Sequence, residues 1–237
     1  MTKTQIILMF MMLLALHASA QIDDKFLDDL REPPNPFTKS RIFDYINNEN
    51  LNPDDYEGYY QRGILNIENG FYEEAIKYFR YIIIPQQDIV GGQAGFAEPY
   101  FYIGVCKSML GGYDSAMYFF NKTIEIDPLY IEAYNERGIL FLSRGEYKNA
   151  LQDFEFSNMH NTQSPQPPYN IGYCHFLLGD DRKAKKTLKG VMKDFPDYYR
   201  SYLLYGHINS LKGKYNKAEK NFSQAVELNP GDPLTHY

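Results

Sequence analysis

Two cysteines and five histidines are the residues of this 237-residue chain best suited to redox or metal chemistry. Cys106 and Cys174 invite a disulfide, yet both occupy the same place in a repeated pattern. That place is predicted to be buried, and equivalent places two repeats apart are too distant for a disulfide, whose Cα atoms lie within about 7 Å. We therefore predict two small, reduced core residues, in a column that leucine or isoleucine fills in the other copies: Leu65, Leu140 and Ile208.

The histidines show no spacing that is typical of a metal site. The chain has no H-E-x-x-H motif, and no pair of cysteines stands near any histidine. His175 falls at a helix-core register, and His207 falls on the face that is predicted below to contact a ligand. The sequence therefore predicts no metal and no cofactor.

The motifs of common catalytic sites are also missing from the sequence. It contains no G-x-S-x-G nucleophile turn, no P-loop and no dinucleotide-binding glycine motif. Acidic pairs such as Glu73-Glu74 occupy adjacent helix positions, which do not face one another, so they are unsuited to joint acid–base catalysis. We predict that the protein is not an enzyme.

The charge of the chain is acidic, with 24 Lys and Arg against 30 Asp and Glu and a formal net charge of −6. Binding to nucleic acid depends on neutralising phosphates, and binding to an anionic membrane surface depends on basic clusters. We identify no Lys/Arg-rich block in the sequence. With this charge balance we expect the protein to bind neither nucleic acid nor an anionic membrane surface. The net charge is interpreted as a contribution to solubility.

The first residues, 1–20, are typical of a secretory signal peptide. An apolar run of eleven residues, Ile6 to Leu16, is followed by the small residues Ala18-Ser19-Ala20. Eleven residues rise only about 16 Å as a helix, roughly half of a bilayer core, so a membrane span is disfavoured. We expect cleavage after Ala20, and a secreted or periplasmic protein without an integral membrane span.

Small residues recur through the rest of the chain with one period. The first glycine column is spaced by 41, 34, 34 and 34 residues. An alanine follows each of these glycines after 12 residues, and a second glycine follows after seven. The first column is Gly63, Gly104, Gly138, Gly172 and Gly206; the alanines are Ala75, Ala116, Ala150, Ala184 and Ala218; the second glycines are Gly70, Gly111, Gly145, Gly179 and Gly213.

This pattern resembles the tetratricopeptide repeat (TPR) family, whose unit is a 34-residue helix–turn–helix. Aromatic residues recur four positions before the first glycine and two positions after the second, as in Tyr134 and Tyr147. The resemblance implies an all-α fold, a right-handed α-solenoid of five helical hairpins plus an N-terminal capping helix. We expect glycine and alanine to face each other, so that two helix backbones approach closely, and the second glycine to end its helix in a left-handed conformation.

The repeat register divides the chain after the signal peptide. We expect a leader or linker at 21–40, either partly disordered or docked on the array, a capping helix at 41–55, the array at 56–232 and a tail at 233–237. A loop insertion at 85–96, rich in glycine, accounts for the longer first interval. The five repeats are 56–89, 97–130, 131–164, 165–198 and 199–232.

In this family the first helix of each hairpin lines a concave groove, and the resemblance therefore implies a peptide-binding face. Its first feature is an acidic row, formed by Glu57, Glu98 and Glu132. Its second feature is an apolar and aromatic stripe, which is densest at Tyr169, Tyr173 and Phe176. The alternative is that the stripe packs against neighbouring helices instead of a ligand. The candidate groove residues are Glu57, Tyr60, Ile64, Glu98, Phe101, Val105, Glu132, Asn135, Ile139, Tyr169, Tyr173, Phe176, Arg200 and His207.

Two functions are compatible with these patterns. The first is an exported scaffold that binds a protein or peptide segment of unknown identity in its groove. The second is a structural envelope protein that self-associates as a homo-oligomer through its C-terminal hairpin or its leader. Neither function involves catalysis.

Overall fold

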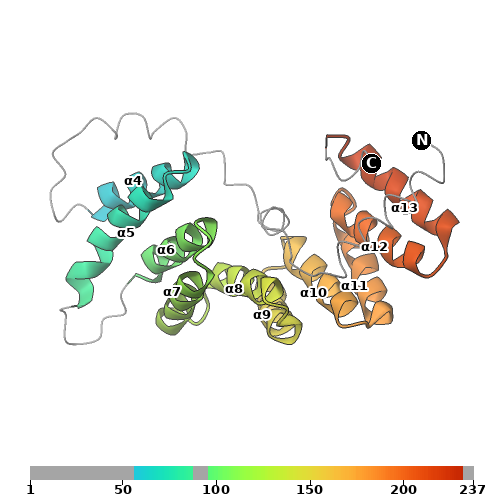
Figure 1. Cartoon of the computed structure of the whole chain (residues 1–237), viewed down its shortest axis with the longest axis horizontal. Coiled ribbons are helices and arrows are strands. Elements are labelled where there is room, and N and C mark those ends of the chain that lie inside the picture. Colours follow the sequence, from blue (N-terminus) through green and yellow to red (C-terminus); the bar gives the residue numbers. More distant parts are fainter. Residues whose placement is uncertain (1–55, 88–95, 232–237) are drawn as a thin grey trace. The chain divides into compact units, whose positions relative to one another are not determined.

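The computed structural model describes residues 56–87 and 96–231, and the side chains of 84–87 are outside that description. The described residues form ten α-helices and no strands (Figure 1). In chain order the helices are α4 (Tyr56–Glu68), α5 (Tyr72–Gln87), α6 (Ala97–Met109), α7 (Tyr113–Ile126), α8 (Ile131–Ser143), α9 (Tyr147–His160), α10 (Gln166–Leu177), α11 (Asp181–Asp194), α12 (Tyr199–Leu211) and α13 (Tyr215–Leu228).

The helices gather into two compact units, and each is described by itself. One unit holds the described residues up to Leu140, and the other holds residues from Phe141 onward. In the first, α4 packs on α5, α5 on α6 and α6 on α7. In the second, α9 packs on α10, α10 on α11, α11 on α12 and α12 on α13. Consecutive helices therefore stack on their neighbours, and the predicted all-α fold of TPR-type hairpins is confirmed.

Each short turn inside a hairpin depends on a glycine in a left-handed conformation. Gly111 has a φ of 73°, and its N–H donates to the Ser108 carbonyl at 3.0 Å. The next residue, Gly112, donates to the Lys107 carbonyl at 2.8 Å, which completes the hydrogen-bond pair of a glycine-ended helix. The other four glycines of the column have φ between 69° and 79°. The predicted left-handed helix ends are confirmed.

The first glycine column makes room for a different partner from the one expected. A Cβ built on Gly63 would lie 2.5 Å from Cζ of Phe79, and one on Gly104 would lie 2.6 Å from Cε1 of Phe120. The expectation that glycine faces alanine is therefore wrong in its main contact. An aromatic ring from the second helix lies on the bare glycine backbone, because a ring buries more apolar surface than a methyl group does.

The core of the first unit is built from these contacts. Ala75, Phe79 and Ile103 are fully buried and pack with partly buried tyrosines from the first helices. A second cluster joins Phe120 to Ala133, which brings the start of α8 against the α6–α7 hairpin. In this unit the first helices of the hairpins therefore pack on the core, and these helices carry candidate groove residues.

Both cysteines lie in the interior, as predicted. Cys106 and Cys174 are 0% exposed and neither forms a disulfide. Burial raises the pKa of each thiol to about 12, because a thiolate loses its hydration in the core. Both residues therefore serve as small apolar side chains and are poor nucleophiles.

The predicted loop 85–96 is wrong at its start. Helix α5 continues through Pro85 to Gln87, three residues into the expected loop. The residues 88–95 lie outside the described part of the chain. So do the predicted signal peptide 1–20, the predicted leader 21–40, the predicted capping helix 41–55 and the tail 233–237. Among the described residues, no helix is both long and apolar enough to span a bilayer.

Candidate functional site

Three glutamates lie on the first helices of the first unit. Glu57, Glu98 and Glu132 stand in the first turns of α4, α6 and α8, and all three are exposed. A carboxylate in the first turn is stabilised by the partial positive charge of the helix N-terminus, typically by about 0.3–1 kcal/mol. The acidic row therefore helps to start each helix, and at the same time it leaves carboxylates open to a ligand.

A tyrosine connects this row across two hairpins. The Tyr60 hydroxyl on α4 donates to Glu98 Oε1 on α6 at 2.5 Å. The Tyr60 ring also lies edge-on to the Tyr102 ring, with centroids 5.8 Å apart. Tyr102 in turn stacks on the core residue Phe79 at 5.3 Å. The carboxylate of Glu98 is therefore positioned by a phenol that the hydrophobic core holds in place.

The electrostatics show that the carboxylates act on one common region. Burial, followed by the hydrogen bond to Glu98, raises the pKa of Tyr60. Burial also raises the pKa of Tyr102 and of Tyr130, and the negative charges of Glu98 and Glu132 raise both further. A field that disfavours an additional negative charge favours a positive one. We name Glu57, Tyr60, Glu98, Tyr102 and Glu132 the acidic–aromatic surface.

This surface has the chemistry of recognition. Carboxylates accept hydrogen bonds from Lys, Arg or amide donors, and tyrosine rings attract cations over their faces. Within the described ranges, no cluster of three His, Cys, Asp or Glu side chains is placed to hold a metal ion. The arrangement is suited to binding a basic segment that also carries apolar side chains.

The other candidate groove residues of this unit divide by exposure. Tyr60, Ile64, Val105 and Asn135 are partly exposed. Phe101 and Ile139 are buried, at 8% and 0% exposure, and the Phe101 ring lies 5.0 Å from that of Tyr130. The prediction that these two residues contact a ligand is therefore wrong, because both are part of the buried core.

The aromatic stripe predicted on the second unit is not open in this structure. Tyr169 and Tyr173 are only 6% and 5% exposed, and the Tyr169 ring meets Tyr198 edge-on at 5.5 Å. The prediction that both present a free surface is wrong, since they take part in packing, the alternative already raised by the sequence. Phe176 and His207 are partly exposed and their rings lie 5.6 Å apart, so they remain candidates. Arg200 is also partly exposed, and its Nε donates to the Tyr199 hydroxyl at 3.3 Å.

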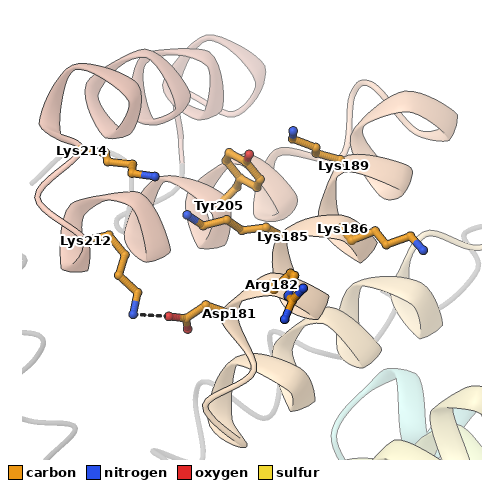
Figure 2. A pocket seen from close by; sticks show the side chains of 8 residues that line it. All are labelled: Asp181, Arg182, Lys185, Lys186, Lys189, Tyr205, Lys212 and Lys214. Carbon is orange, nitrogen blue, oxygen red and sulfur yellow. Dashed lines mark ion pairs between the residues drawn. The ribbon is translucent and has the colours of Figure 1, made fainter.

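Sequence reasoning missed Tyr102 of the acidic–aromatic surface, its neighbour Tyr130, and a basic pocket in the second unit (Figure 2). Tyr102 and Tyr130 lie outside the repeat places assigned to the groove, so no motif indicated them. The expectation that the chain has no Lys/Arg-rich block is wrong, because residues 182–189 contain five basic residues in eight. The net charge of the whole chain conceals this run.

Comparison with known proteins identifies the repeats. Tetratricopeptide repeat models match residues 169–198 and 199–232. The chain contains tetratricopeptide repeats. Among curated relatives of these TPR units, the human mitochondrial import receptor subunit TOM70 is 24% identical over 124 residues, which are 49% of this chain and 20% of that protein. The match spans about a fifth of the relative's length.

Solved TPR structures share the fold over a larger part of the chain. MamA (residues 41 to the end) from Desulfovibrio magneticus RS-1 is 20% identical, with a TM-score of 0.65, and the match covers 76% of this chain and 98% of that one. YrrB, described as a TPR protein with an unusual peptide-binding site, is 17% identical, with a TM-score of 0.61 over 78% of this chain and 91% of its own. At these identities the similarity shows the fold alone.

Proposed function

We propose that this TPR protein is a non-catalytic scaffold that binds a peptide or protein segment on the acidic–aromatic surface. The observation that carries the proposal is the Tyr60–Glu98 hydrogen bond beside Tyr102, which fixes a carboxylate and two rings together. TPR folds are typical of protein-interaction scaffolds, and YrrB is described as having a peptide-binding site. The negative charge of the surface further indicates that the ligand is positively charged.

The expected ligand is a segment with Lys or Arg next to apolar side chains. Glu98 and Glu132 supply acceptors, while Tyr60 and Tyr102 supply apolar faces that also attract cations. An acidic segment is disfavoured, because the same carboxylates already raise the pKa of the neighbouring tyrosines. Complementary charge also speeds association and makes it sensitive to salt.

A fluorescent peptide of alternating lysine and leucine tests this proposal. Binding to the full chain is measured by anisotropy at two salt concentrations. The double variant Glu98→Gln/Glu132→Gln is expected to weaken binding by about tenfold, because two charge-assisted contacts are lost. The matched control is Glu73→Gln/Glu74→Gln, which removes the same charge from exposed positions of α5 in the same unit.

The control is expected to change binding by less than about threefold, since exposed charges at a distance are largely screened. Equal losses in the two variants would show that only net charge matters, and the proposal would fail. Unchanged binding in both variants would place the ligand elsewhere.

We also propose that the protein is exported, on the basis of the signal-like residues 1–20. N-terminal sequencing of the protein recovered from its native host checks this point. A mature chain that begins at Gln21 supports export, whereas a chain that retains the apolar run contradicts it.

A further inference from the structure

The basic side chains of this acidic protein are concentrated in one segment. Residues 181–220 contain eleven Lys and Arg and four Asp and Glu, a net charge of +7, in a chain whose formal charge is −6. The remainder therefore carries −13. A chain that only needed charge for solubility would have no reason to separate the two signs in this way.

The fold brings part of this charge into one pocket of the second unit. The pocket has a volume of about 680 Å³ and lies where α11 faces α12 and the turn between α12 and α13 (Figure 2). Helix α11 supplies basic residues at helical spacing, and the turn supplies two more. The lining residues are Asp181, Arg182, Lys185, Lys186, Lys189, Tyr205, Lys212 and Lys214.

Lys185 is held at the centre of the pocket. Its Nζ donates to Oδ1 of the buried Asn209 at 3.0 Å and lies 6.0 Å from the centre of the Tyr205 ring. Figure 2 shows the ammonium ends of Lys185 and Lys214 approaching one another beside Tyr205. Burial and the positive charges of Lys214, Lys212 and Lys217 lower the pKa of Lys185, whereas Asp181 raises it. The local potential is therefore positive.

Among the residues that the structure describes, few of these charges are neutralised. Asp181 Oδ2 pairs with Lys212 Nζ at 2.6 Å. Arg182, Lys186, Lys189 and Lys214 make no ion pair with any other residue of the described segments. These four cations line one pocket without a carboxylate partner among the described residues, which leaves them available to an anionic ligand.

The pocket is separate from the predicted groove. Groove residues of α12 are Arg200 and His207, and at 100° per residue Tyr205 points to about the opposite side of that helix. The pocket and the groove therefore belong to different faces. The pocket is positively charged, whereas the acidic–aromatic surface is negatively charged, so the ligands of the two sites must differ.

We propose that this basic pocket is a second docking site, which binds an acidic, Asp/Glu-rich segment of a protein partner. Its cations form a ladder along α11, at 182, 185, 186 and 189, and this elongated array matches carboxylates repeated along a peptide. A small phosphorylated ligand would need a concave site that encloses most of its surface. Here the side chains spread across two helices and a turn (Figure 2).

The probe is a fluorescent ten-residue peptide of alternating glutamate and aspartate, titrated into the full chain. The pocket variant is Lys185→Gln/Lys186→Gln/Lys189→Gln. Its matched control, Lys148→Gln/Lys193→Gln/Lys220→Gln, removes the same charge from exposed positions of the same unit that do not line the pocket. The pocket variant is expected to bind about tenfold more weakly. The control is expected to lose less than about threefold through the long-range field.

A gain-of-function variant guards against loss by misfolding. Asp181→Asn removes the acidic group that occupies Lys212, and it is expected to strengthen peptide binding by about twofold to threefold, in proportion to the modest energy of an exposed ion pair. Weaker binding in the pocket variant together with stronger binding in Asp181→Asn supports the site. No binding by the wild type, or equal loss in the pocket variant and its control, overturns it.

Two further arms test other occupants. Tripolyphosphate and a short single-stranded RNA are titrated separately at equal charge concentration. If either binds more tightly than the peptide and depends on the same lysines, the pocket recognises phosphate and the proposal is wrong. Light scattering of the chain alone tests a second copy as occupant: oligomers that dissociate in the pocket variant would also overturn it.

Discussion

The ring of Phe222 lies on the backbone of Gly206, so that a methyl group at this glycine would come within 2.6 Å of Phe222 Cε1. Carbon atoms in van der Waals contact stand about 3.5–4.0 Å apart. Both residues are buried, and they join α12 to α13. The last hairpin is therefore closed by an aromatic ring on a bare helix backbone.

We predict that Gly206→Ala destabilises the protein by about 1–3 kcal/mol, because the buried ring must move. Gly190→Ala is the matched control: this glycine lies inside α11 with nothing within 4 Å of an added Cβ. There the substitution is expected to stabilise by about 0.5–1 kcal/mol through the helix preference of alanine. Urea unfolding followed by circular dichroism measures both. A Gly206→Ala protein as stable as the wild type would contradict the packing argument.

The fourth repeat supplies an internal comparison. Leucine replaces phenylalanine there, and the nearest approach of a Cβ on Gly172 is 3.1 Å, to Leu188. Leucine has rotamers that relieve such a contact more easily than a ring does. Gly172→Ala is therefore expected to cost less than Gly206→Ala, by about 1 kcal/mol. The same unfolding measurement checks this, and equal losses would show that ring size is not the cause.

The sequence predicted the hairpins well, because two columns of glycine and one of alanine share one register, and each glycine column meets a structural need: space for a packed side chain in the first and a left-handed turn in the second. It did not reveal which residue meets the glycine. The alanine follows after 12 residues and the large apolar residue after 16, and both columns are equally regular. The choice between them depends on how the second helix is rotated, which is a property of the packed hairpin and not of the spacing.

The candidate surfaces were harder to predict. The acidic row could be read from the repeat register, since Glu57, Glu98 and Glu132 share one place. The role of Tyr102 could not, because it depends on a contact with Tyr60 from another hairpin. The basic pocket combines 181–189 with 205–214, and the one sequence signal that could have indicated it, the local run of charge along α11, was overlooked.

The left-handed glycines permit a second stability test, independent of packing space. Gly213 has a φ of 69°, and an added Cβ would meet nothing within 4 Å. Gly213→Ala is therefore expected to destabilise by about 1 kcal/mol through backbone strain alone. Gly213→Asn is expected to lose less, because asparagine tolerates this conformation. Thermal unfolding of the two variants measures the difference, and an alanine variant that is the more stable of the two would contradict it.

The cysteines should be inert in the native protein. Cys106 and Cys174 are fully buried, and burial raises the pKa of both thiols to about 12. We predict that a thiol-reactive dye at pH 8 labels neither residue in the native protein and labels both in guanidinium chloride, because the thiolate is the reactive form. Non-reducing electrophoresis should show no intramolecular disulfide. Rapid labelling of the native protein would mean that one of the two repeats opens.

His175 provides a pH dependence with a defined sign. Burial, followed by the charge of Lys183, lowers its pKa below the ordinary value of 6.5. As pH falls, the unfolded chain therefore takes up this proton before the folded chain does, so the contribution of His175 to stability is complete above pH 6.5 and is lost toward the lower folded-state pKa.

We predict that the wild type loses more stability between pH 7.5 and pH 5.5 than His175→Gln does, since glutamine does not titrate. Urea unfolding at both pH values gives the two differences. The substitution leaves every other titrating group in place, so their contributions cancel when the two proteins are compared. If His175→Gln lost as much stability as the wild type over this interval, the ring would be as easily protonated in the folded protein as in the unfolded chain, and its burial beside Lys183 would have no energetic consequence.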